Sequence, residues 1–448
     1  MSSHPRKARV FVTLSLVLIL LLLGGQNYVY KEIPILTEAE AFKHITSSNA
    51  PSSSSKGNTI QSSFSSQPKI ASTSAGCINY IPTARAITVS CNSARLTDIY
   101  NKIHDSSVLS KQPNGIWFLS ANLLIAKGAV FHIDPTDTKW LKINSKVTGG
   151  SGLAKTSAYY IDIHGSMMIN SVKITSWDPT TNYYAITNGS RTGIGQFILG
   201  ALRPGIIVEK DATGPTDIMN SEIAYLGYEG GKHLGASGFA YSGGDGSILK
   251  NDNIHHMYFA FYSIGVGHMI IENNIIRNSG HYGLDPHTGT HDMIVRNNTI
   301  YDNNGSGIIC SLNCYNILIE NNRVHDNAEN GIDFSRNMTN SIARNNIVYN
   351  EPSGIFVSQS HNNQIYNNTV SNSRVGLNVN SGSSNNKILA NTISHSITNA
   401  ILLTSGASSN TFSSNKIVAS TPQGLKIEQD PTSKNNVFSN NQIIHSMN

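Results

Sequence analysis

Charged and aromatic residues are scarce in this chain of 448 residues. Asp, Glu, Lys and Arg make up 13% of it, Phe, Trp and Tyr 8%, and hydrophobic residues as a whole only 39%. So little apolar material argues against a conventional large core. The net charge of +5 is too small for the basic footprint of a nucleic-acid-binding protein, so no nucleic-acid partner is expected. The chain also lacks a calcium-binding repeat of the G-G-x-G-x-D type, and we expect neither a metal nor another cofactor.

Long apolar runs are absent except near the N-terminus. Val10–Leu23 is 14 residues long, short of the roughly 20 that a membrane-spanning helix needs, and a basic stretch precedes it. This arrangement predicts that residues 1–30 are a secretory signal peptide. Because Gly24-Gly25-Gln26 is a poor cleavage site, the alternative is an uncleaved signal anchor, held in the membrane by residues 10–23. Either way the rest of the chain is expected outside the cell or at its surface.

Cysteine is rare as well, with four residues. In an oxidising exterior Cys77 and Cys91 could pair. Cys310 and Cys314 are too close for a bridge along one strand and could bond only across a bend. The alternative for this second pair is two small buried thiols.

Two segments follow the apolar run and precede the main repeat. Residues 31–76 are rich in Ser and cannot bury enough surface to offset their ordering entropy, so we expect a flexible linker. Residues 77–150 are expected to form an N-terminal cap region with one short helix, at 95–104, and the first strands. The helix would cover the open end of the domain that follows. Its apolar face consists of Leu96, Ile99, Tyr100 and Ile103.

Asparagine is the residue in excess. It occurs 51 times, 38 of them from Asn251 onward, and no ordinary helical domain tolerates this because Asn competes for backbone hydrogen bonds. An Asn-Asn pair with an apolar residue within the next two positions recurs at intervals of 24, 24, 24 and 22 residues. The second Asn of the pair lies at 274, 298, 322, 346 and 368, and weaker copies continue at Asn391, Asn415 and Asn441. A small residue before an apolar one keeps the same interval at Gly283, Gly307, Gly331, Gly354, Gly376, Ala400 and Gly424.

This repeat predicts an all-β fold, a parallel β-helix with about 22 to 26 residues per coil over residues 151–448. Each interval holds about three short strands, and the coils would stack at about 4.8 Å. Asn tolerates the left-handed backbone of the bends, and stacked Asn amides can bond from coil to coil, so we interpret these residues as structural. A leucine-rich repeat has a similar period, but its leucine framework is missing. The pattern continues less regularly upstream, through Asn253.

The small-residue marker also predicts which side chains share a face. It places Leu284, Ile308, Ile332 and Ile355 in one inward row. The adjacent outward rows are Asp285, Ile309, Asp333 and Phe356, and then His287, Ser311, Ser335 and Ser358. One strand therefore presents a carboxylate and an imidazole to solvent, with Asp333 two coils later and Tyr262 one coil before. Pro286 between them cannot donate to the strand ladder, and such a local defect often marks a site.

The hexapeptide Tyr-Gly-Leu-Asp-Pro-His at 282–287 resembles the Tyr-Gly-x-Asp-Pro-His signature of the alginate (mannuronan) C5-epimerases, a family of right-handed parallel β-helices. Residues 223–228 and 253–262 are also similar to its single-module periplasmic members. The resemblance implies an isomerase that inverts C5 of β-D-mannuronate units in a polyuronate, giving α-L-guluronate. The C5 proton is α to a carboxylate. Its removal requires that this charge be neutralised, with a base on one face and a proton donor on the other.

The same resemblance implies the roles of the motif residues. His287 matches the base, which can be neutral near pH 7, and Tyr282 matches the opposing acid or base, a place that water could also take. Asp285 would orient His287 or hold a protonated substrate carboxylate; as an exposed, ionised residue it is not expected to be the general acid. Tyr262, directly before Asp285 in the stack, is expected to pack on a sugar ring, and Asp333 to contact the substrate.

The chain departs from the family after Gly307. Family members tend to carry an Asp or Arg there, whereas this chain reads Cys310-Ser311-Leu312-Asn313. Arg336, stacked on Leu312, is our candidate for bidentate binding of the substrate carboxylate, with a solvated surface Arg as the alternative. Lys232 and Lys250 are the fallback cations.

Two other functions would use the same surface. A polyuronate lyase abstracts the same proton but breaks the bond at O4 and leaves an unsaturated product. A non-catalytic β-helix would bind surface glycans or proteins, and Asp285 and His287 would be incidental. An anionic polysaccharide is the expected partner, and the chain is expected to be a monomer.

Overall fold

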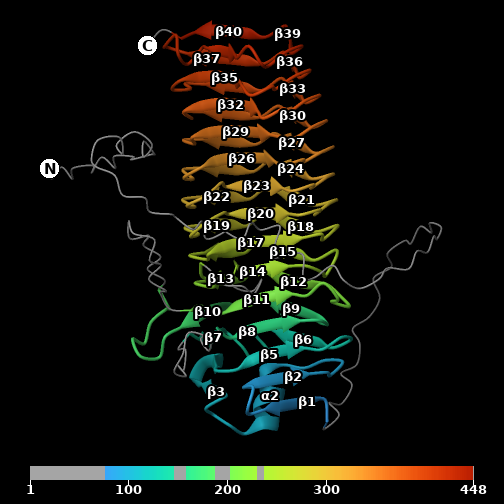
Figure 1. Cartoon of the computed structure of the whole chain (residues 1–448). Helices are drawn as coiled ribbons and strands as arrows, with labels where there is room; N and C mark the ends of the chain where they lie inside the picture. The colour runs from blue at the N-terminus through green and yellow to red at the C-terminus, as the bar shows by residue number, and fades with distance from the viewer. Residues whose placement is uncertain (1–75, 146–157, 187–201, 230–236, 447–448) are drawn as a thin grey trace, which may run out of the picture. The chain divides into compact units, whose positions relative to one another are not determined.

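The computed structural model describes residues 76–145, 158–186, 202–229 and 237–446. They belong to one compact unit, Ile70–Asn448. Three long sheets, called A, B and C here, are wound into a parallel β-helix of about 12 turns with about 24 residues per turn. Figure 1 shows the strands of successive coils stacked on one another. The predicted all-β solenoid is confirmed.

Each coil passes from sheet A to sheet B to sheet C, and the chain then returns to sheet A one coil further on. Sheet A consists of β1 (Ile78–Ile81), β2 (Ala86–Val89), β5 (Asn122–Ile125), β8 (Tyr160–Ile163), β11 (Gly205–Val208), β14 (Gly238–Tyr241), β17 (Phe259–Ile264), β20 (Leu284–His287), β23 (Ile308–Ser311), β26 (Asn330–Ser335), β29 (Ser353–Ser358), β32 (Val375–Asn380), β35 (Asn399–Leu403) and β38 (Ile427–Gln429). Sheet B consists of β6 (Val130–Ile133), β9 (Ser166–Asn170), β12 (Thr216–Met219), β15 (Ile248–Lys250), β18 (Ile270–Glu272), β21 (Ile294–Arg296), β24 (Leu318–Glu320), β27 (Ile342–Arg344), β30 (Gln364–Tyr366), β33 (Lys387–Leu389), β36 (Thr411–Ser413) and β39 (Val437–Ser439). Sheet C consists of β3 (Leu109–Gln112), β4 (Ile116–Leu119), β7 (Trp140–Asn144), β10 (Lys173–Trp177), β13 (Glu222–Ala224), β16 (Asn253–His255), β19 (Ile275–Arg277), β22 (Thr299–Tyr301), β25 (Arg323–His325), β28 (Ile347–Tyr349), β31 (Thr369–Ser371), β34 (Thr392–Ser394), β37 (Lys416–Ala419) and β40 (Gln442–His445).

The core fills the inside of the coil. In sheet A the parallel register pairs Leu284 with Phe261 and with Ile308, and Ile308 with Ile332. All four side chains are fully buried. This confirms the inward row that the sequence spacing predicts, and it places the alternate residues of the same strands on the outer face.

An asparagine ladder follows the bend between sheets B and C. Each side-chain Nδ2 from Asn274 to Asn415 donates to Oδ1 of the next coil's Asn at 2.9–3.0 Å. Most of the residues that precede the ladder positions, such as Asn273 and Asn297, have a left-handed backbone with φ of 59° and 56°. Both structural roles predicted for Asn are therefore confirmed.

The repeat departs from the predicted register in two places. Ile401 pairs with Ile427, so Ala400 lies beside Lys426 rather than Gly424, because a turn before β38 lengthens this coil. Upstream, the ladder residue is Asp252, whose backbone N–H donates to Asn274 Oδ1 at 2.8 Å, while Asn253 lies one position later and pairs with Ile275.

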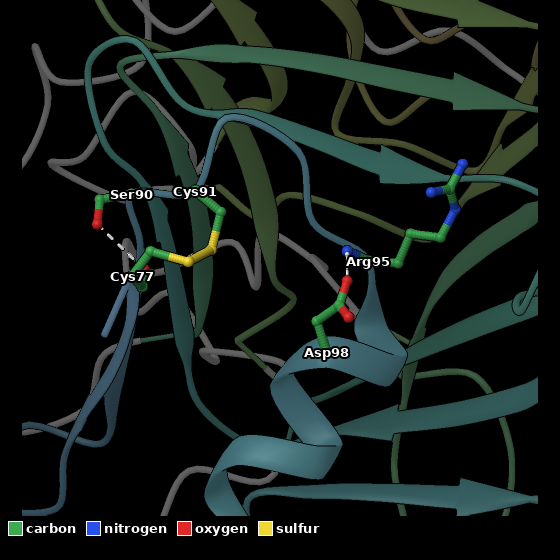
Figure 2. Close-up of a disulfide and its surroundings, with 5 residues drawn as sticks. All are labelled: Cys77, Ser90, Cys91, Arg95 and Asp98. Atoms are coloured by element: carbon green, nitrogen blue, oxygen red, sulfur yellow. Dashed lines mark hydrogen bonds between the residues drawn. A yellow bond between two sulfur atoms is a disulfide. The ribbon is translucent and has the colours of Figure 1, made fainter. Parts of the chain in front are cut away.

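The N-terminal end carries the one helix predicted there. Helix α2 (Leu96–Ile103) buries Leu96 and Ile99 against the core, while Tyr100 stays at the surface. Asp98 caps it by accepting from the backbone N–H of Arg95 at 2.8 Å (Figure 2). A short 3-10 turn, η1 (Pro113–Gly115), joins β3 to β4, and the pairs β1–β2 and β3–β4 are antiparallel. The parallel coil begins well before residue 151, with the pairing of β2 to β5.

The four cysteines form one disulfide and leave two free thiols. Cys77 and Cys91 form a disulfide beside α2 (Figure 2). Cys310 and Cys314 are free and buried. Within the described ranges, no helix is long and apolar enough to cross a membrane. The segment Val10–Leu23, the predicted signal region 1–30 and nearly all of the predicted linker 31–76 lie outside those ranges.

Candidate active site

The predicted motif residues lie on strand β20, between β17 and β23 of sheet A. Leu284 points into the core, so Asp285 and His287 lie on the outer face, in register with Tyr262 and Ile264 of the preceding coil. Asp285 and His287 are nevertheless only 2% exposed. The expectation of a solvated Asp285 and His287 was wrong, because bulky side chains of adjacent coils, among them Tyr262, cover this part of the sheet.

Within the described ranges, the polar side chains near His287 include those of Thr288, Tyr262 and Arg336. Nδ1 of His287 lies 2.6 Å from Oγ1 of Thr288 and 3.4 Å from the hydroxyl of Tyr262, and its Nε2 lies 3.3 Å from Nη2 of Arg336. A guanidinium can only donate, so Nε2 accepts this hydrogen bond. The remaining ring proton is then assigned to Nδ1, which donates to Thr288. This arrangement leaves Nε2 unprotonated, as a general base requires.

Arg336 reaches His287 from two coils away. It follows β26 in a left-handed conformation, with φ of 49°, stacked on Leu312 as predicted. Its Nε donates to Oγ of Ser311 at 2.8 Å, and Ser311 is the residue paired with His287 in the intervening strand β23. The hydroxyl thus helps to direct the guanidinium toward the imidazole. Of the fallback cations, Lys250 pairs with Glu272 at 2.7 Å, and Lys232 lies outside the described residues.

Asp333 lies on the outer face in register with Ile309, two coils from Asp285. It is buried, and Nδ2 of Asn330 donates to its Oδ2 at 3.0 Å. Burial raises the pKa of Asp333 to about 7, while Asn330 and Arg336 oppose this shift. A carboxyl group with this pKa is partly protonated at neutral pH and can donate a hydrogen bond to another carboxylate.

Tyr282 lies in the connection from sheet C to β20. Its half-buried ring contacts His281, with 4.0 Å between ring centres, and Phe259, with 5.6 Å. Burial raises the pKa of the phenol, the negative charges of Asp285 and Asp333 add to the effect, and Arg336 opposes it. The hydroxyl is therefore in the same electrostatic environment as the other candidates, and it is protonated at neutral pH. It is suited to donate a proton rather than to accept one.

Several residues of this site escape prediction from the sequence alone. Thr288 and Ser311 are the partners that orient His287 and Arg336, and Phe259 and His281 form a stacked pair, 4.9 Å apart, beside Tyr282. Thr288 has a φ of 33°, which is unusual for a β-branched residue. The one feature of the sequence that could have indicated the role of Thr288 is its position directly after His287. Among the described residues, no group of three or more His, Cys, Asp or Glu side chains is placed to hold a metal ion.

Comparison with known proteins identifies the protein family. The family model of the right-handed β-helix region matches residues 204–370 and 336–448, together more than half of the chain. The chain belongs to this family of right-handed β-helix proteins.

Two curated relatives are mannuronan C5-epimerases. That of Pseudomonas syringae pv. tomato is 27% identical over 216 residues and that of Pseudomonas fluorescens 25% over 218 residues. Each match covers 46% of this chain and 36% of the relative, so the chain matches about a third of the length of these relatives. Among solved structures, the periplasmic alginate epimerase AlgG superposes with a TM-score of 0.67 at 20% identity, over 80% of this chain and 87% of AlgG. This last likeness concerns the fold.

Proposed function

We propose that this chain is a polyuronate C5-epimerase that converts β-D-mannuronate units to α-L-guluronate. The observation that carries the proposal is the contact between Nε2 of His287 and the guanidinium of Arg336 on the outer face of sheet A. This contact supports the proposal, because an imidazole nitrogen that can accept the C5 proton lies beside a cation that can pair with the neighbouring carboxylate. The mannuronan C5-epimerases among the relatives support the choice of substrate.

Each side chain of the candidate site has one role in the proposed reaction. The substrate carboxylate takes over the guanidinium of Arg336 and frees Nε2 of His287, which removes the C5 proton. Asp333, with a pKa of about 7, donates a hydrogen bond to the carboxylate and limits the charge that develops on it. The phenol of Tyr282 then delivers a proton to C5 from the opposite face. Exchange with solvent afterwards removes the proton from His287 and returns one to Tyr282, which restores both groups. The charge of Asp285 contributes to the raised pKa of Tyr282.

The place of action follows from the disulfide. Cys77 and Cys91 are bonded, and such bonds persist in oxidising compartments. We place the protein outside the cytoplasm, at the cell surface or beyond, where an anionic polysaccharide is accessible. Anchoring through residues 10–23 and a monomeric state are part of this proposal.

Incubation with polymannuronate in deuterated water tests the function. NMR should reveal guluronate signals and deuterium at C5, and His287→Gln should reduce the rate about a thousandfold while the protein stays folded. His268→Gln is the matched control, because that imidazole is exposed in the bend that joins β17 to β18. A product with a double bond, detected in the near ultraviolet, would replace the epimerase by a lyase. A folded protein that leaves the polymer unchanged would contradict both and favour a binding function.

A further inference from the structure

A group of aromatic and basic side chains lies on the outer face of sheet C, in coils that precede the candidate active site. Trp140 and Lys142 belong to β7, and Lys173 and Trp177 to β10; the register places Trp140 beside Lys173. The two indole rings meet edge to face, with 5.4 Å between their centres. These four residues are called the sheet C cluster below.

Lys142 is the unusual member of the cluster. Its Nζ lies 3.5 Å from the ring centre of Trp177 and 4.2 Å from that of Trp140, and the residue is only 9% exposed. Burial lowers its pKa, and within the described part of the chain no carboxylate opposes that shift. Lys173, in contrast, is paired with Glu222 at 2.8 Å. A nearly buried ammonium with aromatic neighbours and no counter-ion is suited to receive an anion.

The cluster continues as a row of rings toward the candidate active site. Tyr184 contacts Trp177 at 5.7 Å and is stacked on Tyr225 at 4.3 Å. Tyr225 is in turn stacked on His256 at 4.7 Å. His256 follows β16, one coil before the connection that carries Tyr282. From β10 to β19 the chain advances three coils, which corresponds to about 14 Å at the usual strand spacing.

We propose that the sheet C cluster and the adjoining ring of Tyr184 form a second carbohydrate-binding surface, which holds a distal part of the same anionic polysaccharide. This inference rests on the proposed function and assigns a remote subsite to it. Uronate carboxylates pair with Lys142 and Lys173, and the pyranose rings pack on the exposed parts of the aromatic row. Tyr183, which is 51% exposed and contacts Tyr184 at 4.9 Å, extends the surface outward.

The arrangement of the rings favours a sugar chain over a single-stranded nucleic acid. Nucleic-acid surfaces of this kind offer free ring faces on which bases stack. Here Tyr184 and Tyr225 occupy each other's faces with only 3° between their planes, and Lys142 lies over both indoles. Lys142 and Lys173 lie beside these rings. Rings with adjacent ammonium groups suit a polymer that carries both apolar sugar faces and carboxylates.

The test compares a long and a short substrate on the full-length protein. Lys142→Gln and Trp177→Ala should raise KM for polymannuronate at least about fivefold and leave the turnover of a mannuronate trimer unchanged, because a trimer in the active site is too short to reach the cluster. Tyr183→Ala, at an exposed position, should have the same effect in weaker form without risk to folding. Tyr315→Ala is the control, since this exposed ring lies in the bend before sheet B, outside the cluster.

Binding to an inactive His287→Gln background separates this inference from the proposed function. If polymannuronate binds in a Lys142-dependent way but no C5 exchange occurs in the wild-type protein, the surface stands and the epimerase does not. If exchange occurs and the cluster variants change KM for polymer and trimer equally, or for neither, the surface is refuted. Tighter binding of single-stranded polynucleotide than of polymannuronate would also refute it.

Discussion

The coils from Asn274 onward and the coils before it are built on the same three sheets but differ in regularity. From Asn274 on, the ladder position holds Asn in every coil up to Asn441, and the spacing between coils stays within 22–26 residues. Before it, Asp252 and Ser221 occupy the equivalent positions, and Ile161 of one coil pairs with Ile206 of the next.

The candidate active site lies where these two regions meet. Strand β20 is preceded by irregular coils that carry the aromatic row, and it is followed by regular coils that contribute Ser311, Asp333 and Arg336. The regular part supplies a fixed spacing that brings residues from three coils to one place. The irregular part carries the sheet C cluster. Rings and cations also stack in the regular coils, as Tyr301, His325, Tyr349 and Arg323 do in sheet C, so a regular repeat does not exclude them.

Breaking the ladder inside the regular region should have the largest effect. Asn322 accepts two hydrogen bonds from Asn298 and donates to Asn346 and to the carbonyl of Val295. Asn322→Leu should lower the free energy of unfolding by about 4 kcal/mol, because buried groups lose their partners. Denaturant titration measures this. Asn321→Asp, at the exposed neighbour, should change stability by less than about 0.5 kcal/mol. Equal losses of unfolding free energy at both positions would mean that the hydrogen bonds of the ladder do not stabilise the coils.

Replacing Arg336 by Lys tests the contribution of the regular coils to the site. The guanidinium contacts Ser311 through Nε and His287 through Nη2, and a single ammonium cannot keep this geometry. Arg336→Lys should therefore reduce kcat about a hundredfold, as followed by deuterium incorporation at C5. Arg374→Lys, at an exposed position, should leave it unchanged. If the Arg336→Lys variant retains full activity, charge alone suffices at this position.

Restoring the ladder at the irregular end should have the smallest effect, and it is stabilising. Burial raises the pKa of Asp252 to about 7, above the roughly 3.9 of an unfolded Asp. The native state therefore loses stability as the pH rises from about 4 to 7. Asp252→Asn should raise the free energy of unfolding by about 2 kcal/mol at pH 8, and by progressively less as the pH falls below 7. A gain that is the same at pH 4 and pH 8 would contradict the assigned cause.

Much of the fold could be predicted because the repeat is visible in the sequence. A fixed interval determines the inward row, the outward rows and the Asn ladder, and the outward rows put Asp285 and His287 on one strand with Asp333 two coils further on. The burial of Asp285 and His287 could not be predicted, since it depends on how Tyr262 and Arg336 fold over the strand. The sheet C cluster escaped because its residues are separated by segments of unequal length, which no repeat reveals.

The asparagine ladder also gives the coil a direction. Each Nδ2 from Asn274 to Asn415 donates one N–H to the Asn of the next coil and the other to a backbone carbonyl of the preceding coil. The side-chain oxygens of Asn298 to Asn441, in contrast, all accept from the coil before them. At the N-terminal end of the row, Oδ1 of Asn274 accepts from the backbone N–H of Asp252, whose pKa burial raises to about 7. A row of uncharged side chains thereby distinguishes the two ends of the solenoid.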